Sequence, residues 1–228
     1  MNDLEIKDYY DQLAQDYDDQ RFNNSYGKYL DRQEKKFLHD YLHKAEPPKD
    51  WKVLDVGCGT GRLLEYATHG IDFSPEMLKV AQQKFPEKNL QLGDLTELPF
   101  ADGSLDLIFC FHVIMHQDLK TTQQFIEQAY QKLKVGGRLI FDFPSSKRRL
   151  RVKHQQKNWH AANQMAIEDI YKMTEKSWEL LSYQGFLFLP IHRMPAKYRK
   201  KFIVLDTIFC HSPLKEYASY LAVILEKK

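Results

Sequence analysis

The feature that most constrains the fold is a regular alternation of short apolar runs and helix-like segments between residues 51 and 144. Five brief apolar runs are typical of buried strands, namely WKVLDVG, HGIDF, NLQLGD, SLDLIFCFHV and GRLIFDF. Three segments between them have the apolar spacing of helices, namely TGRLLEYA, SPEMLKVAQQKF and TTQQFIEQAYQKLK. Strands that alternate with helices favour right-handed crossovers, so the sequence predicts an α/β fold with a mostly parallel sheet and helices on both faces.

The segments outside this alternation are less regular. We expect a polar helix over 5–19, a helix over 28–45 and a last strand within 216–228. The pattern predicts a helix over 161–184 and a strand over 185–191, whereas the apolar run 200–211 fits either. No change of composition marks a linker, so residues 1–228 are expected to form a single domain.

Composition narrows the class of protein. The chain has no apolar run of the about 18 residues that a transmembrane helix needs, and its first residues lack the apolar core of a signal peptide. We therefore expect a cytoplasmic protein without a membrane partner. The three cysteines are far apart and form no closely spaced pair, which predicts neither a disulfide framework nor a metal site.

The charge is unevenly distributed along the chain. The formal net charge is +2, but residues 145–228 carry 16 lysines and arginines against 7 acidic residues. A basic segment of this size indicates a polarised surface, which is either solvated or directed at an anionic partner.

A glycine-rich turn follows the first expected strand, in VLDVGCGTGRL. Gly57, Gly59 and Gly61 allow the backbone to bend sharply and to approach a ligand closely. A dinucleotide fingerprint would have its third glycine where this chain has Arg62. The turn therefore departs from the pattern of nicotinamide-dependent enzymes.

Acidic residues end or follow the first three expected strands. They are Asp55, Asp72 and Asp94, and the carboxyl ends of parallel strands meet at one edge of a sheet. A cleft lined with acids favours a ligand with amino and hydroxyl groups over a pyrophosphate. Asp55 is a candidate partner of a cationic amino group, Asp72 of two ribose hydroxyls and Asp94 of an adenine amine, at about 1.5–3 kcal/mol for each charge-assisted bond.

Four motifs in this order resemble the successive motifs of the class I S-adenosylmethionine-dependent methyltransferases, namely VLDVGCGTGRL, GIDFSPEML, LQLGDLTELPFADGSLDLIFC and LKVGGRLIFDFP. The N-terminal YDQLAQDYD is similar to the lid helix often found ahead of this core. The resemblance implies a Rossmann-like seven-stranded sheet with an antiparallel last strand. It also implies a helical lid in 1–45, a cofactor-binding core in 51–144 and acceptor-side segments in 145–228.

The resemblance further implies S-adenosylmethionine as cofactor, S-adenosylhomocysteine as product, and roles for single residues. The loop of Gly57, Cys58, Gly59 and Gly61 would follow the methionyl part of the cofactor, with Asp55 at its amino group. The other cofactor positions that it implies are the ribose-binding Asp72, the adenine-flanking Phe73, Met77, the adenine-edge residues Asp94 and Leu95, Phe111 at the methionyl group, and Tyr17 and Arg21 of the lid.

Residues on the acceptor side are identified less sharply. His112 and His116 follow the fourth expected strand, and each is either a general base or a packed residue. Tyr10 of the lid and Arg148 and Arg149 of the basic run SKRRLRVKH are candidate acceptor contacts. The basic run is interpreted equally well as a solvated loop that contacts no acceptor.

The motifs together predict methyl transfer to an oxygen, nitrogen or carbon atom of a small-molecule acceptor, and anionic acceptors are included. Catalysis is expected to depend mainly on the positioning of the cofactor and the acceptor. The alternative is an RNA methyltransferase of the tRNA type that uses the basic C-terminal third. Two further classes are a nicotinamide-dependent oxidoreductase and a cofactor-binding regulator without acceptor chemistry. Arg62 in the glycine turn and the acid-lined cleft count against the oxidoreductase.

Overall fold

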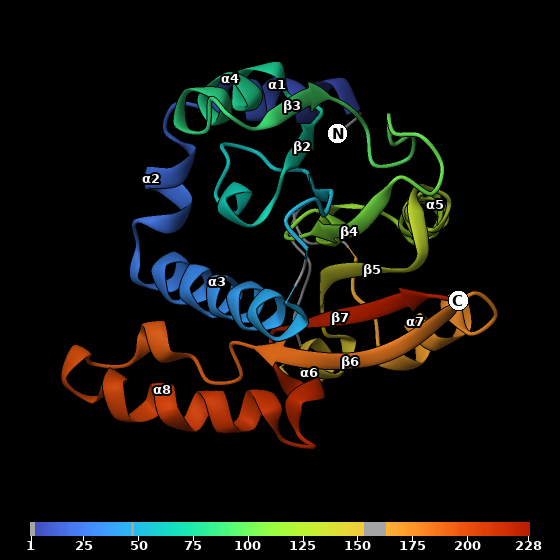
Figure 1. Cartoon of the computed structure of the whole chain (residues 1–228). Coiled ribbons are helices and arrows are strands. Elements are labelled where there is room, and N and C mark those ends of the chain that lie inside the picture. Colours follow the sequence, from blue (N-terminus) through green and yellow to red (C-terminus); the bar gives the residue numbers. More distant parts are fainter. Residues whose placement is uncertain (1–2, 47, 153–162) are drawn as a thin grey trace.

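One mixed sheet organises the chain in the computed structural model, which describes residues 3–46, 48–152 and 163–228 (Figure 1). The seven-stranded sheet has the order β3-β2-β1-β4-β5-β7-β6. Its strands are β1 (Val53–Val56), β2 (His69–Asp72), β3 (Asn89–Leu92), β4 (Leu105–Cys110), β5 (Leu133–Pro144), β6 (Trp178–Phe186) and β7 (Tyr220–Lys227). Only β7 runs antiparallel to its neighbours, β5 and β6. The predicted mostly parallel sheet with an antiparallel last strand is confirmed.

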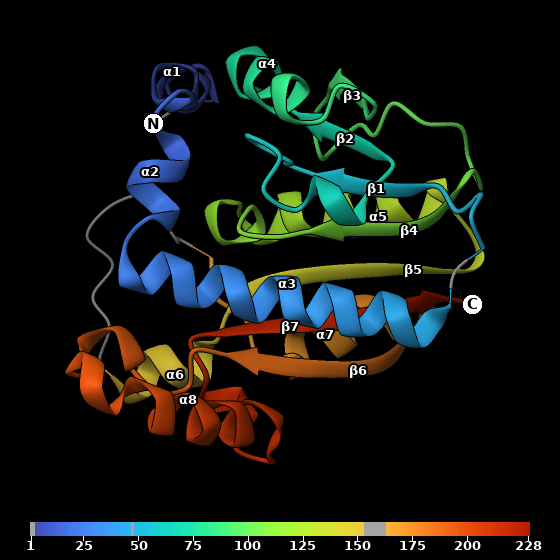
Figure 2. The ribbon, with the colours of Figure 1, turned by 60° about the vertical axis from the view of Figure 1, so that its left-hand side comes forward.

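Helices cover both faces of the sheet (Figure 2). On one face lie α3 (Ser25–Ala45) and α4 (Pro75–Lys84), and α3 packs its buried Leu30 and Leu38 against the strands. On the other face lie α5 (Leu119–Lys132) and α7 (Ile167–Thr174). Two helices, α1 (Asp3–Leu13) and α2 (Tyr17–Phe22), precede α3, and the shorter α6 (Ser146–Arg151) and the longer α8 (Ala196–His211) belong to the C-terminal part.

Local sequence signals fix the start of two helices at the edge that carries the site. Ser74 caps α4, because its side chain accepts a hydrogen bond from the backbone N–H of Met77 at 3.1 Å, and Pro75 occupies the first turn. Asp118 caps α5 in the same way and accepts from the backbone N–H of Thr121 at 2.7 Å. Both helices begin at the ends of loops that follow parallel strands.

Two elements differ from the sequence-based expectation in the first half of the chain. The crossover from β1 to β2 holds only a single 3-10 turn, η1 (Leu64–Tyr66), because the glycine turn leaves too little chain for a full helix. The expected helix over 5–19 is divided into α1 and α2. α3 takes the place of a crossover helix on this face, since Leu30 and Leu38 pack in the same apolar cluster as Leu64.

The prediction for the second half of the chain is partly wrong. Of the expected helix over 161–184, the structure describes residues 163–184, and among these only α7 is helical. β6 starts inside this range and ends early in the run 185–191. β6 is held by pairing with β7, in which Leu180 lies opposite Leu225 and Phe186 opposite Tyr220. The ambiguous run 200–211 is helical and belongs to α8. Within the described ranges, no helix is both long and apolar enough to cross a membrane.

Candidate active site

A cavity of about 590 Å³ opens at the carboxyl ends of the parallel strands, beneath α1. Twelve of the residues singled out in the sequence line it, namely Tyr10, Tyr17, Gly57, Gly59, Asp72, Phe73, Met77, Asp94, Leu95, Phe111, His112 and His116. A smaller hollow of about 40 Å³ shares the glycine turn with this cavity and is lined by Asp55, Cys58 and Arg62. The residues implied for the cofactor thus gather at one edge of the sheet.

The glycine turn has a backbone that residues with side chains rarely adopt. The φ angles of Gly57, Gly59 and Gly61 are 71°, 52° and 89°. A Cβ atom on Gly57 would lie 2.3 Å from Cγ2 of Val113, whereas a Cβ on Gly59 would meet nothing within 4 Å. The bare backbone at Gly59 therefore faces open space, as a ligand cradle requires. Gly61 lies outside both cavities and packs against Leu64.

Asp72 joins the glycine turn to the start of α4. Its Oδ2 accepts a hydrogen bond from the backbone N–H of Gly59 at 2.8 Å, and its Oδ1 accepts one from the backbone N–H of Ser74 at 2.9 Å. Burial raises the pKa of Asp72 to about 6, although these N–H groups favour the charged form. At neutral pH the carboxylate is mostly ionised and lies in the cavity wall as a strong acceptor.

Asp55 is the most perturbed acid of the site. Burial raises its pKa to about 8, the neighbouring Arg62 opposes this rise, and Asp72 adds to it. The Asp55 side chain is therefore largely protonated at neutral pH and would ionise next to a cation. Burial also raises the pKa of the Cys58 thiol well above its usual value, so Cys58 is a packed thiol and no nucleophile.

Contacts from α1 and α2 hold these helices over the cavity. Asp11 of α1 accepts a hydrogen bond from the Ser74 hydroxyl at 2.5 Å, and Asp18 of α2 accepts one from the Thr60 hydroxyl at 2.5 Å. The ring of Tyr10 lies edge-on to the ring of Phe73, with 5.8 Å between centroids. The two helices therefore contact both the glycine turn and the residues after β2.

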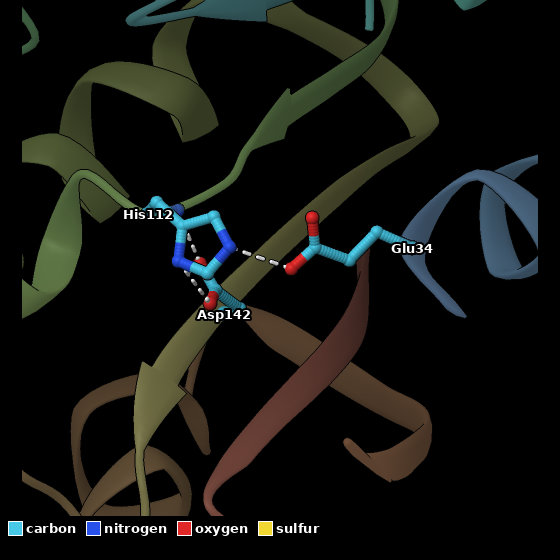
Figure 3. A group of neighbouring side chains, drawn as sticks. All are labelled: Glu34, His112 and Asp142. Atoms are coloured by element: carbon cyan, nitrogen blue, oxygen red, sulfur yellow. Dashed lines mark hydrogen bonds and ion pairs between the residues drawn. The ribbon is translucent and has the colours of Figure 1, made fainter. Parts of the chain in front are cut away.

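A buried group of charged side chains lies directly behind His112 (Figure 3). Glu34 of α3 is fully buried, and its two carboxylate oxygens form ion pairs of 2.7 Å with Nε2 of His112 and with Nη1 of Arg62. Nδ1 of His112 lies 3.7 Å from Oδ2 of Asp142 in β5, and the backbone N–H of His112 donates to Oδ1 of Asp142 at 2.7 Å. Arg62 also pairs with Asp31 at 3.1 Å.

This group fixes the charge of His112. Burial favours the neutral imidazole, but the carboxylates of Glu34 and Asp142 outweigh burial and raise the pKa of His112. Burial also opposes ionisation of Glu34, yet His112 and Arg62 lower its pKa. The carboxylates of Glu34 and Asp142 thus favour the imidazolium form of His112, which has a backbone φ of 61°.

Glu34, His112 and Asp142 are residue types that bind metals, and their ligand atoms lie within 4.8 Å of one another. Nε2 and Nδ1 of His112 already face the carboxylates of Glu34 and Asp142, however, so a metal ion would have to replace these ion pairs (Figure 3). The nearby Arg62 cation disfavours a second cation as well. We interpret the group as an ion-paired cluster.

Sequence reasoning missed Glu34 and Asp142. One signal could have found Glu34: it lies four residues from both Leu30 and Leu38, so an acid interrupts the apolar stripe of α3. Asp142 carries no comparable signal, because a single acid inside a β-strand is compatible with many structures. Its position opposite His112 depends on the neighbouring strands β4 and β5.

Besides Gly61, three predicted residues lie outside both cavities. Arg21 of α2 donates from Nη2 to the hydroxyl of Tyr9 at 2.9 Å. Arg148 and Arg149 lie in α6, and Nη1 of Arg149 donates to the backbone carbonyl of Asn163 at 3.2 Å. Their roles toward cofactor or acceptor stay predictions.

Comparison with known proteins agrees with this geometry. A family model described as a methyltransferase domain matches residues 54–141. The ubiquinone/menaquinone biosynthesis C-methyltransferase UbiE of Geotalea daltonii is 30% identical over 164 residues, which are 65% of this chain and 67% of that protein. An uncharacterised protein of Methanocaldococcus jannaschii is 34% identical over 139 residues, which are 60% of this chain and 50% of that protein. The match thus spans half the length of this relative.

Solved structures share the fold. The magnesium protoporphyrin IX methyltransferase of Synechocystis, solved with bound S-adenosylhomocysteine, has a TM-score of 0.70 at 17% identity, with both chains fully covered. The glycine turn and the acid-lined cavity define a nucleoside-binding α/β protein, and the matches narrow this class further. The chain belongs to the class I S-adenosylmethionine-dependent methyltransferases, and S-adenosylmethionine is the cofactor of this family.

Proposed function

We propose that this protein transfers the methyl group of S-adenosylmethionine to a small-molecule acceptor. The observation that carries the proposal is the cavity of about 590 Å³, which joins the glycine turn to the aromatic and histidine residues beneath α1. Its volume lies in the range of small-ligand sites. The coverage by α1 and α2 favours a compact acceptor over a folded nucleic acid. The similarity to a C-methyltransferase of ubiquinone and menaquinone biosynthesis from Geotalea daltonii supports this.

The residues of the cavity fit the cofactor. The open backbone at Gly59 suits the methionyl chain, and the largely protonated Asp55 would ionise next to the cationic amino group of that chain. Asp72 would accept hydrogen bonds from the ribose hydroxyls, while Phe73 and Leu95 would flank the adenine. We assign these roles as proposals.

Catalysis would rest mainly on how the chain positions its two ligands. The cofactor supplies an activated methyl group on a sulfonium. Tyr10, Tyr17 and Phe111 line the cavity and would exclude water from it, while the contacts of α1 and α2 restrict how the acceptor approaches. His112 is engaged in the ion pair with Glu34. We propose His116 in η2 (Ile114–His116), which lines the cavity, as the base for an acceptor that arrives protonated.

Calorimetric titration with S-adenosylhomocysteine, with NADH as the comparison ligand, tests the proposal. We expect micromolar binding of the former and none of the latter, followed by methylation of a compact acceptor in a screen with radiolabelled cofactor. Binding of NADH alone would contradict the proposal. Methylation of RNA, with binding that falls steeply as salt rises, would favour the nucleic-acid alternative instead.

The pKa of Asp55 leads to a prediction on cofactor binding. Because burial raises this pKa to about 8, the free protein holds a proton that a bound amino cation would displace. Below pH 8 the complex thus holds fewer protons than the free protein, and raising the pH from 6 toward 8 should tighten binding. The dissociation constant should fall by at most about tenfold for each unit by which the pH is raised.

The measurement is the dissociation constant of S-adenosylhomocysteine between pH 6 and 9 for the wild type and for Asp55→Asn. The ligand's own amino group titrates in both proteins, so the difference between the two pH profiles reports Asp55. We expect weaker binding and a flatter profile for Asp55→Asn. Parallel profiles would show that Asp55 does not ionise on binding. Asp102→Asn, at an exposed turn, serves as the control.

A further inference from the structure

The outer face of α8 is unusual for a surface helix because it carries aliphatic and basic side chains and no acid. Val204, Leu205 and Ile208 are exposed by 60%, 43% and 56%. The exposed positions of this face are Lys197, Tyr198, Lys200, Lys201, Val204, Leu205, Thr207, Ile208 and His211. With 3.6 residues per turn, these residues lie on one side of the helix. We call this set the outer face of α8.

The opposite side of α8 already has its partners. Asp206, the helix's one acid, is fully buried and accepts hydrogen bonds from the Tyr29 hydroxyl at 2.7 Å and from Nε2 of Gln33 at 2.9 Å. Cys210 is buried beside it, and Phe202 packs against the core. The aliphatic residues of the outer face therefore do not serve the packing of α8 on the sheet.

Positive charge continues beyond the outer face. Burial lowers the pKa of Arg148 in α6, and the guanidinium groups of Arg151 and Arg193 lower it further, which places three arginines near one another. Among the residues that the structure describes, no carboxylate lies within ion-pair distance of Lys197, Lys200 or Lys201. This end of the molecule thus combines uncompensated cations with exposed aliphatic groups.

We propose that the outer face of α8 binds the surface of an anionic lipid bilayer, with the helix lying in the plane of the headgroups. The lysines would contact lipid phosphates, and the three aliphatic side chains would enter the acyl boundary. A bilayer fits because it is a flat anionic surface with apolar material directly beneath, whereas a nucleic acid offers no apolar layer to Val204 and Ile208. A second copy of this face would bring like charges together.

The placement of α8 supports this proposal. In Figures 1 and 2 the helix lies along an outer edge of the molecule, and in Figure 2 its N-terminal end projects on the side of the sheet where α1 and α2 lie. A bilayer could therefore contact the outer face without meeting the sheet. The sequence had led us to expect no membrane partner because it lacks a long apolar run; a helix that lies on the surface needs none.

Co-sedimentation with lipid vesicles tests the proposal. We expect the full-length protein to bind vesicles of phosphatidylcholine with phosphatidylglycerol, to leave them at high salt, and not to bind pure phosphatidylcholine. The triple variant K197Q/K200Q/K201Q should bind about 100-fold more weakly, as expected from three basic residues near an anionic surface. V204S/I208S should bind about tenfold more weakly at unchanged net charge.

The matched control is K49Q/K79Q/K120Q, which removes the same charge from exposed positions outside α8 and should bind like the wild type within a few-fold. Unchanged thermal melting and S-adenosylhomocysteine binding would show that all variants are folded. Equal loss in the control and the α8 triple variant would reduce the effect to net charge and overturn the proposal. So would absence of vesicle binding by the wild type, or a dimer in solution that V204S/I208S dissociates.

Discussion

The variant Glu34→Ala should lose about 3 kcal/mol of unfolding free energy, which is large for one substitution. Glu34 is fully buried and pairs with both His112 and Arg62 at 2.7 Å. Its removal leaves the largely buried His112 with only Asp142, and the largely buried Arg62 with only Asp31, as an acidic partner. The loss lies at the low end of the range for broken buried pairs because these two carboxylates remain.

Urea unfolding at neutral pH measures this loss. Glu65→Ala is the control, since Glu65 forms a half-exposed ion pair of 3.5 Å with Lys35 and should change stability by less than about 1 kcal/mol. A double-mutant cycle of Glu34→Gln and His112→Asn should give a coupling energy above about 1 kcal/mol. If Glu34→Ala were as stable as Glu65→Ala, the ion pairs of the cluster would make no net contribution to the free energy of unfolding.

The second large effect is expected on cofactor binding. Asp72→Ala should weaken S-adenosylhomocysteine binding at least 100-fold, because the proposed role of Asp72 involves two charge-assisted hydrogen bonds of about 1.5–3 kcal/mol each. The substitution also removes the acceptor for the Gly59 N–H at 2.8 Å, which holds the glycine turn. Both losses act in the same direction.

Calorimetric titration measures the affinity, and two further variants separate the causes. Asp72→Asn keeps an oxygen acceptor for the Gly59 N–H but loses the charge, so it should fall between the wild type and Asp72→Ala. Asp102→Ala removes a partner of Lys132 on the surface and should bind normally. A dissociation constant for Asp72→Ala within threefold of the wild type would place the ribose elsewhere.

Sequence patterns sufficed to predict those strands and helices whose structure is determined by residues close together in the sequence. β1, β2 and β4 could be predicted as strands because they are buried on both faces and therefore form short, mostly apolar runs. The helix expected for SPEMLKVAQQKF is confirmed as α4 for an equally local reason, because Ser74 caps its first turn. The prediction for β6 was wrong because Trp178 and Leu181 have the i, i+3 spacing of apolar residues in a helix, and only pairing with β7 decides the outcome.

The residues of the site likewise divide into those that the sequence predicts and those that depend on distant contacts. Asp55, Gly57 and Asp72 lie within or just after the neighbouring parallel strands β1 and β2, so their juxtaposition follows from the sheet alone. The cluster behind His112 joins α3, the glycine turn, β4 and β5, which are distant in sequence. A single sequence contains no signal that pairs Glu34 with His112, and the prediction of His112 as a general base could not take its ion pairs into account.

The position of α3 has a consequence for how the chain folds during synthesis. This helix leaves the ribosome before any of the strands that it covers, so Leu30 and Leu38 have no partner at that stage. Tyr29 meets its partner Asp206 only 177 residues later, about 10–35 s at ordinary translation rates. The nascent chain therefore presents an unburied amphipathic helix for most of its synthesis. Productive folding is expected to be late, dominated by distant contacts and dependent on chaperones that shield α3.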